Sequence, residues 1–97
     1  MSWLEFTWDD RKARENLRKH GVSFHEASTV FTDERALFMA DPEHSTDEDR
    51  FILLGLSAEL RTLVVCHCYR ESADEIRIIS ARKASRSERR KYAERWR

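Results

Sequence analysis

RIISARKASRSERRKYAERW, residues 77–96, predicts a strand that leads directly into a helix, and this pair decides the fold. Its first half opens with the β-branched pair Ile78 and Ile79, which suits a buried strand. The second half opens with a capping box, because Ser85 stands three residues before Glu88. Tyr92 and Trp96 then lie four residues apart on one side of the helix, so we expect both rings to dock on the sheet.

Three apolar runs upstream of this stretch predict the rest of the sheet. The expected strands are residues 36–40, 50–56, 62–69 and 76–81. Short turns join the last three strands, and such connections favour antiparallel neighbours. A longer acidic segment, residues 41–49, separates the first two. We therefore predict a curled antiparallel meander of about four strands.

A short strand and two helices precede the meander. Residues 3–8 alternate between apolar and polar side chains, which predicts the strand. The first helix should start at Asp9 or Asp10 and run to about His20, where Gly21 is suited to a left-handed stop.

The two helices differ in how apolar their expected buried faces are. The first helix has a thin apolar stripe, Ala13 and Leu17. The second begins with a capping box formed by Ser23 and Glu26. Its expected buried face is richer and consists of Phe24, Ala27, Val30 and Phe31.

Two N-terminal helices, a curled antiparallel sheet with a short extra strand, and a C-terminal helix make an α+β fold of two layers. A chain of 97 residues suits a single domain, residues 1–97. No apolar run is long enough to span a bilayer and no signal peptide is recognisable, so we expect no membrane partner and a cytoplasmic location.

Charge is segregated along the chain, although the formal net charge is zero. Residues 77–97 hold nine Lys or Arg and two acids, a net of +7, which leaves −7 for residues 1–76. The basic end either is solvated and balanced by the acidic segment 41–49, or binds an anionic partner such as nucleic acid. Charge alone leaves both readings open.

The residue types favour a chemistry without a metal ion or other cofactor. Gly21 and Gly55 stand alone, so a glycine-rich phosphate loop is missing. Cys66 and Cys68 share one face of their strand and His67 the other, so the three cannot bind one ion without breaking the strand. The remaining Arg, Lys, His and Tyr suit RNA cleavage by the ribose 2′-hydroxyl. That reaction requires a proton acceptor, a proton donor and cations on the phosphate.

Three segments resemble the BrnT family of bacterial toxins: FTWDDRKARENLRKHGVSFHEASTVF (6–31), DPEHSTDEDRFILLGLS (41–57) and IRIISARKASRSERRKYAE (76–94). The resemblance implies a toxin of a type II toxin–antitoxin system, similar in fold to the RelE group of small ribonucleases, that blocks translation by cutting RNA. It also implies a BrnA-type antitoxin encoded beside the toxin. The complex would bind its own promoter DNA through the antitoxin.

Our first hypothesis is therefore a metal-independent endoribonuclease. The expected catalytic residues are Arg50, Arg77 and Arg82 as phosphate and transition-state cations, and His67 as acid or base. Lys19, His20 and Tyr92 are expected to position the RNA. For His67, an inert role on a covered sheet face is equally open, and for His20 a helix-capping role.

One geometric condition applies to the arginines. On a regular strand Arg77 and Arg82 point to opposite faces, so their joint use requires a bulge near Ala81 or a strand end. A second hypothesis, from a different class, is a non-catalytic module whose basic helix binds nucleic acid or an acidic protein partner.

Overall fold

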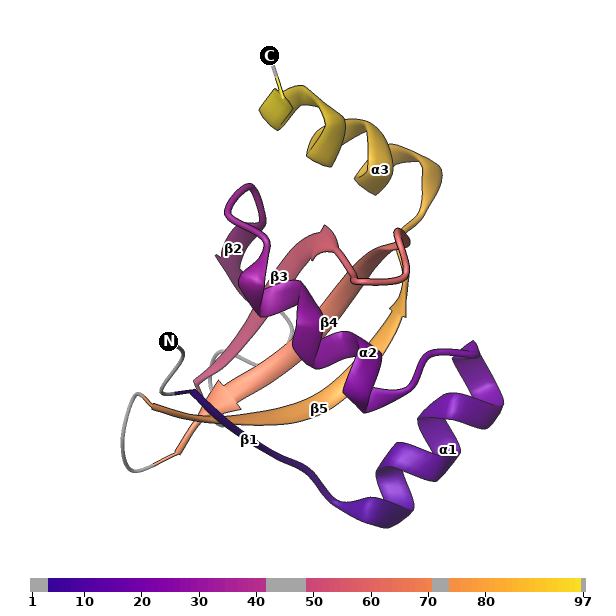
Figure 1. The fold of residues 1–97 in the computed structure, drawn as a ribbon, viewed down its shortest axis with the longest axis vertical. Helices are drawn as coiled ribbons and strands as arrows, with labels where there is room; N and C mark the ends of the chain where they lie inside the picture. The colour runs from indigo at the N-terminus through magenta and orange to yellow at the C-terminus, as the bar shows by residue number, and fades with distance from the viewer. Residues whose placement is uncertain (1–3, 42–48, 71–73, 97) are drawn as a thin grey trace.

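The computed structural model describes residues 4–41, 49–70 and 74–96, and within them five strands and three α-helices form an α+β fold. In chain order (Figure 1) the elements are β1 (Glu5–Thr7), α1 (Asp10–His20), α2 (Phe24–Thr29), the 3₁₀ turn η1 (Val30–Thr32), β2 (Leu37–Ala40), β3 (Arg50–Leu56), β4 (Thr62–Tyr69), β5 (Glu75–Lys83), α3 (Arg86–Ala93) and the 3₁₀ turn η2 (Glu94–Trp96). None of the helices in these ranges reaches the length and apolarity that a bilayer crossing requires.

The meander is confirmed, but the sheet is mixed. Strands β2 to β5 pair antiparallel in sequence, and β3 and β4 have the predicted limits. Strand β1, shorter than the predicted 3–8, adds to the far edge of β5 in parallel, with Phe6 beside Ile76. A hairpin does not join these two strands, so the chain between them is free to return in the parallel direction.

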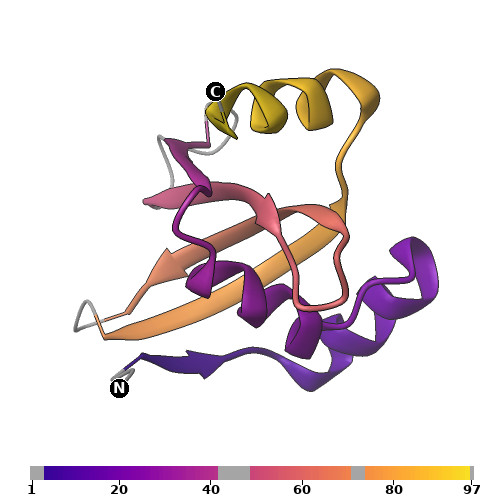
Figure 2. The same ribbon diagram turned by 45° about the horizontal axis from the view of Figure 1, so that its top comes forward.

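Helices cover both faces of the sheet, so the predicted two layers become three. Figure 2 shows α1 and α2 on one side and α3 across the other. We call these the α2 face and the α3 face. The α2 face carries the main core, made by Val22, Phe24, Ala27, Val30, Leu53, Leu63, Val65, Ile78 and Ala81. The α3 face carries a smaller cluster, made by Leu54, Val64, Ala84 and Tyr92.

A β-bulge interrupts β5 opposite the middle of β4. Cys66 pairs with Ser80, whereas the next residue, His67, pairs with Ile78. Ile79 is therefore the extra residue, with no partner across the ladder.

The bulge changes the faces that a regular strand would give. Ala81 joins Ile78 in the core of the α2 face, where regular alternation would separate them. Arg82, opposite Val64, shares the α3 face with Arg77. The bulge that the joint use of both arginines requires is thus present, at Ile79 and not near Ala81. The regular alternation predicted for this strand is wrong.

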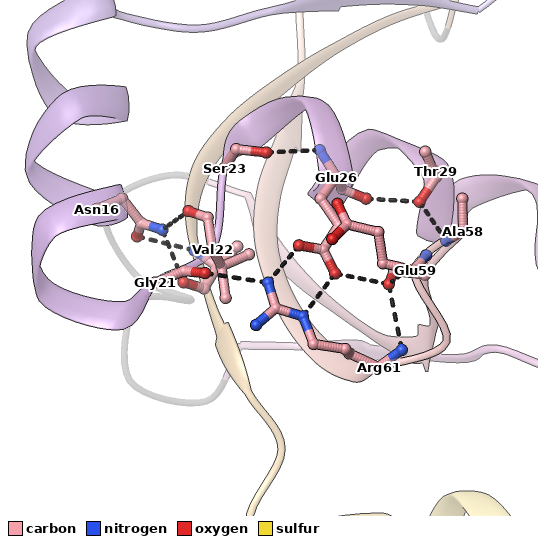
Figure 3. Close-up of polar contacts among 11 residues, drawn as sticks. Asn16, Gly21, Val22, Ser23, Glu26, Thr29, Ala58, Glu59 and Arg61 are labelled. Atoms are coloured by element: carbon pink, nitrogen blue, oxygen red, sulfur yellow. Dashed lines mark hydrogen bonds and ion pairs between the residues drawn. The ribbon is translucent and has the colours of Figure 1, made fainter.

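Asn16 completes the edge of β5 where β1 has already ended (Figure 3). Its amide nitrogen donates to the carbonyl oxygen of Ala81 at 2.8 Å and to that of Val22 at 2.9 Å. Its amide oxygen accepts from the Ala81 N–H at 3.1 Å. The buried side chain of Asn16 thus replaces a strand neighbour and holds α1 against β5. The predicted stripe is correspondingly wrong at Leu17, which is 51% exposed.

A buried carboxylate, Glu26, links α2 to the turn between β3 and β4 (Figure 3). It accepts from the Ser57 hydroxyl at 2.7 Å and from Nε of Arg61 at 2.9 Å, and its other oxygen binds Nη2 of Arg61. Ser23 caps α2 as predicted, accepting from the Glu26 N–H at 3.0 Å. The Glu26 carboxylate binds the Arg61 guanidinium and does not close the predicted capping box, because the ion pair with Arg61 stabilises its negative charge.

Arg61→Ala should lower the free energy of unfolding at pH 7 by about 2–3 kcal/mol, because it leaves the Glu26 carboxylate buried without its partner. The value is below that of a fully buried pair because the Arg61 side chain is 31% exposed. Urea denaturation measures it. The double variant Glu26→Gln/Arg61→Met, which removes both charges, should recover most of the loss.

The same pair should make stability depend on acid. Hydrogen bonds from the Arg61 guanidinium lower the pKa of Glu26 below its ordinary value of 4.5. The stabilisation is therefore present above pH 4.5 and is lost as the pH falls from there through the folded-state pKa. Arg61→Ala should lose less stability than the wild type over that window, and an equal acid loss in both proteins would contradict the assignment.

Candidate active site

A pocket of about 330 Å³ opens on the α3 face, over β3, β4 and β5 and beside the end of α1. It is lined by His20, Asp41, Arg50, Ile52, Val64, Cys66, Ile79, Ser80, Ala81 and Arg82. Three of the residues predicted for the site, His20, Arg50 and Arg82, therefore meet in one place although they are widely spaced in sequence.

The predicted arginines share this face because of the strand register. Arg50 pairs with Cys68, which pairs in turn with Arg77, so the two arginines flank one residue across three strands. Arg82 follows on β5 beyond the bulge. Arg77 lies outside the residues that line the pocket, toward the start of α1. It extends the positive face toward β1.

The guanidinium of Arg82 is held in place by α3. Its two terminal nitrogens donate to the two carboxylate oxygens of Glu88 at 2.8 and 2.9 Å. Glu88 also accepts from the Ser85 N–H at 2.8 Å, which closes the predicted capping box. The Arg82 bonds lower the pKa of Glu88 to about 2, so the carboxylate stays ionised. With a further bond to the Lys83 carbonyl, the described contacts use three of the five Arg82 N–H donors.

One acidic residue, Asp41, lines the pocket beside Arg50. Asp41 is buried, and its N–H donates to the Arg50 carbonyl at 3.0 Å. The Cys66 thiol donates to the Asp41 carboxylate at 3.7 Å. Burial, followed by the Asp41 charge, raises the pKa of Cys66 to about 11, so this cysteine remains a neutral thiol at pH 7.

His67 lies on the α2 face and not with the arginines. It is fully buried among the rings of Phe31, Phe38, Phe51 and Tyr69. Burial lowers its pKa, so the ring is neutral at pH 7. The expectation that His67 acts beside Arg50 and Arg82 is corrected by the two-residue period of β4, which turns it to the opposite side.

The residues expected to position RNA also separate. His20, the last residue of α1, lines the pocket, and its neighbour Lys19 is exposed outside it. Tyr92 is buried on the α3 face, and its hydroxyl donates to the Asp33 carboxylate at 2.6 Å. Tyr92 therefore docks α3 as predicted but has its hydroxyl committed to the protein. The docking predicted for Trp96 lies outside the described side chains.

Two residues of the site were not predicted. The sequence identifies Glu88 only as a helix cap. Its hydrogen bonds to Arg82 cannot be read from the sequence, because they depend on how α3 is placed relative to β5. Asp41 was read as the first residue of the acidic segment 41–49, of which residues 42–48 lie outside the described ranges. Its position directly after β2 is the signal that could have singled it out.

The comparisons with known proteins agree on one family. A family model described as "Ribonuclease toxin, BrnT, of type II toxin-antitoxin system" matches residues 8–88. Among solved structures, the ribonuclease toxin BrnT of Brucella abortus superposes with a TM-score of 0.65 at 24% identity, over 86% of this chain and 99% of that one. No curated protein sequence matches. The family match covers α1 through the start of α3, and the superposition supports the fold.

Tyr92→Phe should lower the melting temperature by several degrees. The ring packing is kept, but the bond to Asp33 is lost, which costs about 1–2 kcal/mol. Differential scanning calorimetry measures the shift. Tyr69→Phe, which removes the hydroxyl of a partly exposed tyrosine on the other face, is the matched control and should melt like the wild type. Equal melting of all three proteins would show that the bond to Asp33 does not anchor α3.

Proposed function

We propose that this chain, which belongs to the BrnT family of ribonuclease toxins from type II toxin–antitoxin systems, cuts RNA in the pocket between Arg50 and Arg82. The meeting of two arginines and a histidine over one hollow of the α3 face is the observation that carries the proposal. These are the residue types that hold a phosphate and move a proton.

Arg50 and Arg82 bind the scissile phosphate and stabilise the charge that builds on it. Glu88 holds the Arg82 guanidinium in one orientation, so little rearrangement is needed when the transition state forms. Arg77 and Lys19, both outside the pocket, are placed to contact the RNA backbone on either side. This arrangement supplies its positive charge from arginines and requires no metal ion.

His20 and Asp41 are the residues for proton transfer. Among the lining residues they are the titratable groups besides the arginines and Cys66, whose thiol stays protonated. One removes the proton from the ribose 2′-hydroxyl as its oxygen bonds to phosphorus. The other protonates the departing 5′-oxygen, which leaves a 2′,3′-cyclic phosphate and a 5′-hydroxyl.

The wider system follows from the family. RNA cleavage of this kind, similar to that expected of the RelE group, would block translation in the cytoplasm. A BrnA-type antitoxin would neutralise the toxin, and the complex would bind DNA through the antitoxin. The alternative, a non-catalytic basic module, predicts RNA binding without new RNA ends.

Purified protein incubated with RNA and EDTA should generate new 5′-hydroxyl ends. Arg50→Ala, Arg82→Ala and His20→Ala should each lower the rate about a hundredfold or more, because a transition-state contact is worth about 3 kcal/mol. Arg82→Lys keeps the charge but loses the fork and should also be impaired. Arg90→Ala, an exposed change on α3, is the control for charge alone. Undiminished cleavage by the folded Arg50 and Arg82 variants would refute the site.

Expression of the chain alone in bacteria should arrest growth, because cleavage of RNA stops protein synthesis. Co-expression of the antitoxin from the adjacent gene should restore growth, and Arg50→Ala should not arrest it. Growth rate and soluble protein are measured together. Normal growth at confirmed soluble expression of the wild type would argue against a toxin.

A further inference from the structure

A second hollow lies between α1 and α2, apart from the active pocket. It measures about 240 Å³, and apolar side chains dominate its lining, among them Trp8, Ala13, Leu17 and Phe24. The Trp8 ring meets Phe24 and His25 edge to face, with centroids 5.9 and 4.9 Å apart. Leu17, 51% exposed, leaves the hollow open to solvent instead of closing it. An open apolar groove of this kind is typical of a surface that binds another molecule.

Arginines border this groove along α1. Arg14 lines the groove and also a neighbouring hollow that it shares with Arg11, Glu15 and Arg18. The spacing of three and four residues places the three arginines on one side of the helix. Glu15 pairs with Arg18 at 3.8 Å, but both side chains are more than half exposed, so the pair neutralises little. The groove therefore carries positive charge along α1 from Arg14 toward Arg18, whereas Asp10, which also lines it, places one negative charge at the start of the helix.

We infer that this α1–α2 groove is a docking site for the antitoxin, and that its occupant is an amphipathic helix with acidic residues beside its apolar ones. The inference rests on family membership, which gives the chain an antitoxin partner, and not on the roles of Arg50 and Arg82. Apolar side chains of the helix fill the groove next to Leu17. Its carboxylates meet the forks of Arg14 and Arg18.

Protein fits this surface better than RNA does. RNA would satisfy the arginines, but its phosphates would leave the apolar lining around Trp8 and Leu17 without a partner. An interface with an apolar centre and charged rim is the ordinary pattern of protein–protein contacts. The groove also lies between α1 and α2, whereas the pocket opens on the α3 face, so an antitoxin helix can dock in the groove without entering the pocket.

Titration calorimetry of the toxin with the antitoxin encoded beside it measures the dissociation constant directly, whether or not the toxin cuts RNA. Leu17→Ser should weaken binding at least tenfold. Arg14→Glu should weaken it as strongly and reduce its salt dependence. Lys12→Glu makes a similar charge reversal on α1 but lines neither hollow, and it should bind like the wild type. Melting curves verify that each variant is folded, with Leu17→Ala as the milder replacement.

The same variants separate the other possible occupants. Unchanged antitoxin affinity in Leu17→Ser and Arg14→Glu overturns the inference. Weaker binding of a single-stranded RNA oligonucleotide, with antitoxin affinity unchanged, assigns the groove to RNA and overturns it as well. A change in the sedimentation of the toxin alone, again with antitoxin affinity unchanged, assigns the groove to a second copy of the chain. Loss of RNA cleavage in the pocket variants tests the proposed active site alone. It does not decide whether the groove binds the antitoxin, RNA or a second copy of the chain.

Discussion

The β-bulge at Ile79 is the constraint on which both faces of the sheet depend. Without the extra residue, the Arg82 side chain would point into the core beneath α2, and the Ala81 side chain would leave that core. With it, β5 keeps an apolar side for the core and a basic side for the pocket. Asn16 then binds the backbone of Ala81 just beyond the bulge, which docks α1 and brings His20 to the rim of the pocket. The bulge at Ile79 therefore determines both the packing of the core and the position of the residues that line the pocket.

Patterns that depend on neighbouring residues predicted most of the fold. Strands β3 and β4 are apolar runs bounded by polar turns, so their limits could be read directly. The caps at Ser23 and Ser85 are likewise local. Asn16 could not be read in this way, because its partner lies 65 residues away on another element. Glu26 had a local partner in its capping box but found a better one in Arg61, where charge and burial combine.

For the candidate site, residue type predicted a place in the pocket only where the side chain reaches the open face. Arg50 and Arg82 met that condition, and the required bulge could be stated but not located, because Ile79 looks like any other strand residue. His67 and Tyr92 have suitable chemistry, yet burial assigns one to the aromatic core and the other to Asp33. Glu88 shows the reverse: a residue recognised for capping a helix also orients an arginine of the pocket.

The pairing of β1 with β5 joins Phe6 to Ile76, two residues that lie 70 positions apart in a chain of 97. A ribosome must therefore release most of the polypeptide before the sheet can close, and Arg82 emerges later still. Contacts between such distant residues also form slowly. A nascent chain consequently carries no assembled pocket while it is being made. The candidate pocket therefore assembles only after its last strand has been synthesised and has paired with the rest of the sheet.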